Sequence, residues 1–347
     1  MYFNLECTAR VTAIYPRGVT DIAWYTTAVV MTLIFLVTLA GNAAVLVALR
    51  RAARVPTHYP LASLAIADLL VGGFVAPIAA ARELFVFHLN WVICSCWSTM
   101  DVLCCTASIL SLCALGWERW CGITAPLSRA KRFRDARLYA ALVWPVSAAV
   151  AMPTALVPAP KHFHPNQMPM ACTVNTNVGY VFFSTAFSFY LPASATVVLY
   201  ARILCALASP PAIRAHRGCS TTERNNNNNV ASMTTGTGQG EETGKEHKGF
   251  ISKMAMRQRR ATRVIVVLMV LFLVCWTPFF TMLPIDSLCD CVPECTWVWC
   301  TWLGYLSSAL NPLVYAGGTS SVRRAMRTTR TTSTSCSISL PVRRTYP

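Results

Sequence analysis

The stretch DVLCCTASILSLCALGWERW, at residues 101–120, is uncharged except for an aspartate at its start and an acid–base pair near its end. Asp101 and Arg119 lie 18 positions apart. In an α-helix that separation is about five turns, or about 27 Å along the axis, on a single face. Because the hydrocarbon core of a bilayer is about 30 Å thick, the stretch predicts a membrane-spanning helix with Asp101 near one surface and Arg119 near the other.

The composition of the whole chain supports a membrane protein. Of its 347 residues, 54% are hydrophobic and only 13% are charged, which is too apolar for an ordinary soluble enzyme. Seven windows are long and apolar enough to cross a bilayer. We therefore predict an all-α fold, a seven-transmembrane helix bundle over residues 24–317, preceded by a tail at 1–23. The expected spans lie near 24–50, 59–82, 94–124, 138–158, 178–206, 262–284 and 296–317.

The basic residues predict the orientation of the chain. The formal net charge of +16 could indicate a nucleic-acid partner, but all except four of the 30 Lys and Arg residues fall on one side of the predicted spans. By the positive-inside rule the N-terminus is extracellular and the C-terminus cytoplasmic. The same basic belt is attracted to anionic lipid, so we expect membrane lipid and no nucleic acid as a partner. The four exceptions are Arg10, Arg17, Arg82 and Lys161.

Two segments outside the spans have a different composition. Residues 207–256 are rich in Gly, Thr, Ser and Asn, which predicts a flexible cytoplasmic loop. Residues 318–347 include SSVRRAMRTTR, whose alternation of basic and apolar residues is typical of a short amphipathic helix on the membrane surface, followed by a tail.

The cysteines expected outside the membrane are candidates for disulfides, because that compartment is oxidising. Cys94 or Cys96, at the start of the third span, is placed to pair with Cys172 in the second outer loop, and Cys94 is our candidate. A local bridge is also expected in the third outer loop, with its connectivity open. The cysteines there are Cys289, Cys291, Cys295 and Cys300.

A carboxylate inside a span costs about 2.5–3.5 kcal/mol on insertion scales, so Asp101 needs a reason to be there. It could bind a cationic ligand, or it could accept a hydrogen bond from a neighbouring helix. The sixth span places Trp276, Phe279 and Phe280 on one aromatic face, and Tyr305 lies in the seventh. Such a face is often only core packing, but opposite an aspartate it forms a box suited to an ammonium group.

Three hydroxyl groups in the fifth span are further ligand candidates. Ser184, Thr185 and Ser188 precede Pro192 on one helix face. They could bond a polar group of a ligand or, as hydroxyls inside spans often do, their own backbone.

The motifs, taken in order, resemble the rhodopsin-like (class A) G-protein-coupled receptors of the biogenic amine group over all seven spans. They are GNAAVLV with Asn42, SLAIADLL with Asp68, the 101–120 stretch, Trp144, SFYLP with Pro192 and Tyr200, FLVCWTPFF, and WLGYLSSALNPLVY.

This resemblance implies a role for each matching residue. Asp101 would be the counter-ion of a protonated amine, and Trp276 with Phe272 and Ile109 would form a packing switch below the ligand. Asp68 would hold a sodium ion in the inactive state, with a structural hydrogen-bond network as the alternative. The implied ligand-binding residues are Asp101, Val102, Cys105, Thr106, Ser184, Thr185, Ser188, Trp276, Phe279, Phe280 and Tyr305. Those for activation and coupling are Glu118, Arg119, Tyr200, Phe272, Asn311, Pro312 and Tyr315, and those for sodium are Asp68, Asn42, Ser108, Ser308 and Asn311.

The resemblance also implies the partners. These are a small-molecule amine, a heterotrimeric G protein, arrestin and receptor kinases, at the plasma membrane, with no catalysis and no cofactor beyond the sodium ion. Segments such as LCDCVPECTWVWCTWLGY are similar to serotonin receptors of type 6, which implies serotonin, the stimulatory G protein and cyclic AMP. The alternatives are dopamine, octopamine, tyramine or histamine as ligand, or a constitutively active receptor.

Three departures from the family pattern bear on these expectations. Trp120 replaces the usual tyrosine after Arg119, Gln258 stands where an acid is common, and Leu283 replaces a residue that is often polar in this group. The first two favour raised basal activity. A transporter or channel is the competing class, but the halves of the chain show no internal repeat of the kind typical of transporters.

Overall fold

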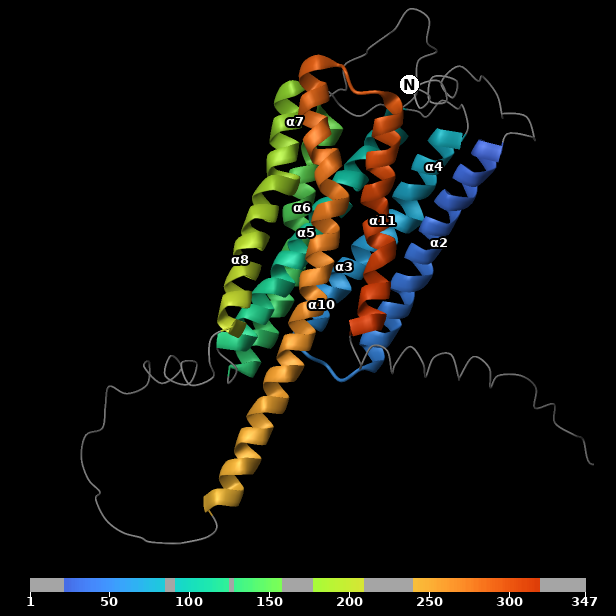
Figure 1. Ribbon diagram of the computed structural model, residues 1–347. Helices are drawn as coiled ribbons and strands as arrows, with labels where there is room; N and C mark the ends of the chain where they lie inside the picture. The colour runs from blue at the N-terminus through green and yellow to red at the C-terminus, as the bar shows by residue number, and fades with distance from the viewer. Residues whose placement is uncertain (1–21, 85–90, 125–127, 158–176, 209–239, 319–347) are drawn as a thin grey trace, which may run out of the picture.

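The computed structural model describes residues 22–84, 91–124, 128–157, 177–208 and 240–318. Within those ranges the regular elements are all helical, and they form a bundle of long, roughly aligned helices (Figure 1). This arrangement is the seven-transmembrane bundle that the sequence predicts.

The first half of the chain supplies four of the bundle's rods. The first is α2 (Ile22–Arg51). The second is continuous and contains α3 (His58–Leu70), η1 (Val71–Val75) and α4 (Ala76–Leu84). The third and fourth are α5 (Trp91–Thr124) and α6 (Arg129–Leu156).

The second half supplies the other three. The fifth rod contains α7 (Val178–Thr185), η2 (Ala186–Tyr190) and α8 (Leu191–Ala208). The sixth is α10 (Gly240–Cys289), and the seventh is α11 (Glu294–Gly318). Two ends of the bundle are named below by the residues of α5 that mark them, the Asp101 end and the Arg119 end.

Two helices begin earlier than the sequence predicts. α6 begins at Arg129 rather than at 138, because the basic residues of its first turns are good helix formers. α10 begins at Gly240, inside the stretch 207–256 expected to be a loop, and its first part projects beyond the bundle (Figure 1). Its sequence GEETGKEHKGFISKMAMRQRR contains no proline and has Glu241 and Glu242 in the first turn, where the helix dipole favours acids. The expected surface helix within 318–347 lies outside the described residues.

Six rods of the described chain are long and apolar enough to cross a membrane, and α11 is the one that falls short by composition. Its sequence includes Gly304, Ser307, Ser308 and Asn311. It nevertheless packs along both α10 and α2, which flank it in Figure 1. α11 completes the bundle because its polar side chains are turned toward the other helices, as the site shows.

Two π-helical turns interrupt the rods, and each precedes a proline. η1 lies before Pro77 and η2 before Pro192. Proline has no backbone N–H and its ring crowds the carbonyl four residues earlier, so the preceding turn widens. At η1 the backbone carbonyl of Val75 accepts a hydrogen bond from the indole nitrogen of the buried Trp97 at 3.0 Å. This contact ties α5 to the second rod.

The bundle core is built around α5, which packs against α3, α6, α8 and α10. Its fully buried side chains include Ile109, Leu112 and Leu115. Large apolar residues elsewhere face outward, as expected for a surface that meets lipid rather than water.

The close approach of α2 and α11 gives a first test. A Cβ added at Gly41 would lie 2.7 Å from the ring of Pro312, whereas one added at Gly317 meets nothing within 4 Å. Gly41→Ala should therefore force the helices apart and lower the free energy of unfolding by about 1–3 kcal/mol. Thermal unfolding of the solubilised chain measures this. The matched control Gly317→Ala should unfold at the parent temperature or slightly above it, and equal midpoints for the two variants would contradict the packing.

Candidate functional site

Asp101 lies in the first third of α5, with its carboxylate directed to α11. Its Oδ2 accepts a hydrogen bond from the hydroxyl of Tyr305 at 3.2 Å. Tyr305 is almost completely buried, with 1% of its surface exposed, whereas Asp101 is only partly buried. Each oxygen of a carboxylate can accept more than one hydrogen bond, so Asp101 can accept from a ligand as well as from Tyr305.

An aromatic cluster extends from Tyr305, and we define it by seven residues of α10, α11 and η2. Trp276 is at its centre, with ring centroids 6.3 Å from Tyr305 and 5.8 Å from Phe279. The indole nitrogen of Trp276 donates to the hydroxyl of Ser307 at 3.2 Å, and its ring covers Gly304 so closely that an added Cβ would lie 3.0 Å away. The members are Phe189, Phe272, Trp276, Phe279, Phe280, Trp302 and Tyr305.

The three hydroxyl candidates of the fifth rod, Ser184, Thr185 and Ser188, are all buried. Thr185 donates to the carbonyl of Val181 at 2.6 Å, which is the backbone bond that the sequence left as an alternative. Ser188, in η2, is 1% exposed and its Oγ has no hydrogen-bond partner among the described residues. Its neighbour Phe189 stacks on Phe280 with centroids 4.5 Å apart. Ser188 is therefore a hydroxyl of this group with bonding capacity to spare beside the aromatic cluster.

The remaining ligand candidates line α5 below Asp101. Cys105 is buried, and Thr106 uses its hydroxyl on the carbonyl of Val102 at 2.7 Å. Leu283, which departs from the family pattern, is buried in an apolar cluster with Tyr180 and Val181. The side chain of Leu283 can therefore offer a ligand apolar packing but no hydrogen bond.

A second polar group lies at mid-bundle, between α2, α3 and α11. Asp68 is 1% exposed and its Oδ2 accepts from Asn311 at 2.8 Å. Asn42 donates to the backbone carbonyl of Ser308 at 3.1 Å. One oxygen of Asp68 and the side-chain oxygen of Asn42 are buried without a partner among the described residues. Ser108 of α5 is also buried, so all five sodium candidates are in the described core.

At the Arg119 end of the bundle, Glu118 pairs mainly with a residue that the sequence analysis did not single out. Glu118 forms an ion pair and hydrogen bond with Arg132 of α6. Arg119 approaches the same carboxylate only at 3.9 Å, and its Nε has no hydrogen-bond partner among the described residues. Sequence reasoning missed Arg132, because a residue in the first turn of the next helix carries no spacing signal that points to Glu118.

Two tyrosines that are candidates for coupling are buried in the core. The hydroxyl of Tyr200 donates to the carbonyl of Leu112 at 3.4 Å. Tyr315 is 2% exposed and its hydroxyl lacks a partner among the described residues. Phe272 belongs to the aromatic cluster, and Pro312 contacts the Gly41 site of α2.

The connection between α10 and α11 is fixed by an aspartate that the sequence analysis did not single out. Asp286 accepts from the backbone N–H of Val292 at 2.9 Å and from the indole of Trp297 at 3.2 Å. Trp297 packs against Phe279 at 5.6 Å between ring centroids. The expected local disulfide joins Cys289 and Cys291. This loop therefore holds one edge of the aromatic cluster in place.

Cys94 is disulfide-bonded, whereas Cys96 is a free thiol. The candidate partner Cys172 lies outside the described residues, so the pairing stays a prediction.

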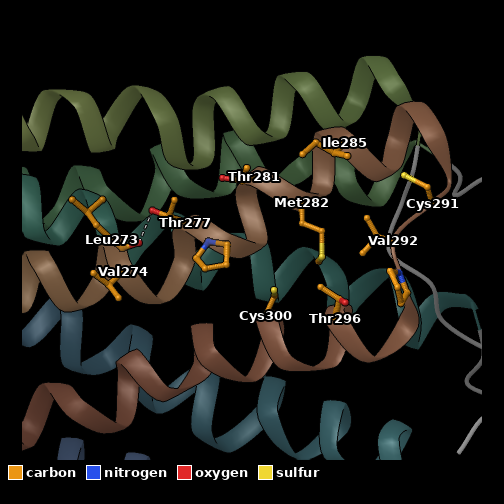
Figure 2. Close-up of a pocket in the computed structure, with 12 residues that line it drawn as sticks. Leu273, Val274, Thr277, Thr281, Met282, Ile285, Cys291, Val292, Thr296 and Cys300 are labelled. Carbon is orange, nitrogen blue, oxygen red and sulfur yellow. Dashed lines mark hydrogen bonds between the residues drawn. The ribbon is translucent and has the colours of Figure 1, made fainter. Parts of the chain in front are cut away.

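A groove of about 800 Å³ lies between α10 and α11, and none of the ligand candidates lines it. Figure 2 shows the residues that line it. The groove is lined by apolar side chains such as Met282 and Ile285, and the hydroxyl of Thr277 at its edge donates to the carbonyl of Leu273. No charged side chain lines it. The groove thus offers no charged group to a ligand.

The site as a whole combines a carboxylate with the faces of aromatic rings. This combination suits a cation, because the carboxylate attracts it and the rings add cation–π attraction. No group of three or more His, Cys, Asp or Glu side chains capable of holding a metal ion occurs within the described part of the chain.

Comparisons with known proteins agree with this architecture. Residues 41–315 match the model of the 7 transmembrane receptor (rhodopsin family). The chain is similar to the alpha-1D adrenergic receptor of Sus scrofa, with 32% identity over 316 residues, 84% of this chain and 54% of that receptor. It is also similar to the 5-hydroxytryptamine receptor 1D of Homo sapiens, with 30% identity over 336 residues, 86% of this chain and 87% of that receptor.

A third relative is the alpha-1A adrenergic receptor of Homo sapiens, with 30% identity over 289 residues, 78% of this chain and 60% of that receptor. The chain thus spans about half the length of the alpha-1D receptor but most of the length of the 5-hydroxytryptamine receptor. The matched family is a class of receptors and not a class of enzymes. With a seven-rod bundle and a family match that covers most of its length, the chain belongs to the rhodopsin family of seven-transmembrane receptors.

Proposed function

We propose that this multi-pass plasma membrane receptor binds a protonated biogenic amine at Asp101 and signals through a heterotrimeric G protein. The observation that carries the proposal is the Asp101 carboxylate, held by Tyr305 at 3.2 Å beside the aromatic cluster. The names of its relatives, adrenergic and 5-hydroxytryptamine receptors, support the same class of ligand.

In this proposal the amine's ammonium group bonds Asp101 and lies against the rings of the aromatic cluster. The polar part of the ligand reaches toward the fifth rod, where Ser188 has an unused hydroxyl. Serotonin is our first candidate, because a 5-hydroxytryptamine receptor is among the relatives and its hydroxyl and indole N–H would suit that wall. The type 6 likeness, with its stimulatory G protein and cyclic AMP, remains a prediction, as do arrestin and receptor kinases as partners.

Signalling follows from a shift between two states. An agonist favours the coupling state only through its higher affinity for that state. The extracellular surface would be the Asp101 end and the G protein would bind at the Arg119 end, as the distribution of basic residues predicts.

Asp101→Asn should abolish most amine affinity, because it removes the charge with little change in volume. Loss of a buried charge pair costs about 3–5 kcal/mol, or two orders of magnitude or more in Kd. Tyr305→Phe should cost about tenfold, since it removes one hydrogen bond to a charged group. The measurement is cyclic AMP and radioligand binding with serotonin, dopamine, octopamine, tyramine and histamine, at matched surface expression. Undiminished binding by Asp101→Asn would sink the counter-ion role.

We further propose that Asp68 and Asn42 hold a sodium ion, because each has a buried oxygen without a partner in the described structure. Oxygen ligands suit a hard cation. Sodium chloride should then raise the unfolding temperature of the solubilised chain above its value in choline chloride of equal ionic strength. Asp68→Asn should lose this difference. If the variant keeps it, the polar group is a structural network only.

A constitutively active receptor is the second candidate, and the Glu118–Arg132 pair favours it. In this bundle Arg119 is not the main partner of its neighbouring acid, so little holds it in a resting position. Arg132→Gln should lower basal signalling. Without Arg132, Glu118 is left to pair with Arg119, and that pair would hold Arg119 in its resting position.

Arg119→Ala, as the companion variant, should reduce stimulated signalling much more than amine binding. Basal and stimulated cyclic AMP, measured beside amine affinity, test both changes. Unchanged basal signalling in Arg132→Gln would argue against this second candidate, and equal loss of binding and signalling in Arg119→Ala would indicate misfolding instead.

A further inference from the structure

A groove of about 850 Å³ lies on the membrane-facing side of the bundle between α5, α6 and α8. α5 packs against both α6 and α8, and the three helices occupy the same side of the bundle in Figure 1. The groove contains none of the ligand, sodium or coupling residues considered above. Its apolar part is formed by side chains such as Leu110, Val146 and Ala195, and several of its residues are open to the membrane.

The residues that line the groove change from apolar to aromatic and basic along its length. On α8 it runs from Leu191 to Arg202, which is about 16 Å at 1.5 Å per residue. That is roughly half of the hydrocarbon core of about 30 Å, the depth of one leaflet. The lining is apolar near mid-bundle, and three aromatic residues and an arginine gather toward the Arg119 end. These are Trp117, Trp120, Tyr139 and Arg202.

Arg202 is the lining residue that most strongly indicates a ligand. It is exposed, it lies within a membrane span, and none of the ion pairs in the described part of the chain includes it. Charged residues inside spans usually face the protein interior and pair there. An arginine that instead faces lipid beside a groove can extend its guanidinium to the headgroup region and bind a phosphate through two parallel hydrogen bonds.

The aromatic side chains fit the same position. Trp117 is 43% exposed and packs edge-on against Tyr139, with ring centroids 6.4 Å apart. Trp and Tyr gather where headgroups meet hydrocarbon. Trp120, the departure from the usual tyrosine after Arg119, lines the groove, so the replacement has a structural consequence here.

The charged residues around the groove determine which kind of lipid headgroup it favours. The first turns of α6, beyond Tyr139 toward the Arg119 end, carry Arg129, Lys131 and Arg134 as exposed residues. No acidic residue lines the groove. A headgroup with net negative charge is therefore favoured over one whose own ammonium cancels its phosphate.

We propose that this groove is a binding site for an anionic phospholipid of the surrounding leaflet, with its phosphate at Arg202 and one acyl chain along the apolar part beside Ala195 and Val198. The lipid bridges α5, α6 and α8. Its binding does not depend on the identity of the amine.

The test uses the full chain purified in detergent, with phosphatidylglycerol and phosphatidylcholine of identical acyl chains as probes, and bound lipid counted by native mass spectrometry. Arg202→Gln should weaken phosphatidylglycerol binding about fivefold and leave phosphatidylcholine unchanged. Ala195→Trp, which fills the groove without changing charge at an exposed position, should weaken both lipids. Arg50→Gln removes an exposed basic residue at the same end of the bundle, on α2, and should bind as the parent does.

Three results would overturn the proposal. Equal losses in Arg202→Gln and Arg50→Gln would mean that the lipid follows the general basic belt. Undiminished binding of both lipids by Ala195→Trp would mean that the acyl chain lies elsewhere. Glycerol phosphate, which has the headgroup without the chains, should not compete; effective competition would reduce the site to a surface phosphate contact. The unfolding midpoint of each variant, compared with the parent, separates loss of lipid from loss of fold.

Discussion

The hydrogen bond from Asn311 to Asp68 joins α11 to α3 in the middle of the bundle, and the position of α11 depends on it and its neighbours. α11 is the rod that does not reach the apolarity of a membrane span. Asn42 donates to its backbone at Ser308, and Trp276 donates to its Ser307. Because hydrocarbon offers no partner for these groups, the polar residues of α11 can be in the membrane only if they face the other helices.

The same requirement places the ligand candidates. Tyr305 lies one turn from Ser308 along α11, so a helix turned inward at mid-bundle also turns Tyr305 inward, where it meets Asp101 at 3.2 Å. Gly304 then lies under the ring of Trp276 with no room for a side chain. The aromatic cluster, the Asp101 site and the polar group around Asp68 are thus consecutive contacts of one helix face. A shift in the position of α11 or α10 would therefore alter the contacts at all three of these sites.

Much of the fold follows from residue type and spacing. Long apolar windows fixed the number of spans, and their ends were misjudged where charged helix formers extend a helix, as at Arg129 and Gly240. Neither π-helical turn was foreseen, although a proline follows each one. The site residues were found by motif. Their partners were not, because Arg132, Asp286 and Ser307 come from other turns and helices with no periodic relation to the residues they bond.

The sequence by itself determined that this chain crosses a membrane, which end of each span is basic, and that an aspartate and an arginine lie at opposite ends of one helix face. Those features depend on local composition and on the 3.6-residue period. Only the tertiary structure decided that Glu118 pairs with Arg132, that Ser188 keeps an unused hydroxyl while Thr185 does not, and that Trp120 and Arg202 share a groove. These outcomes depend on which helices become neighbours and at what height, and that information is spread over the whole chain.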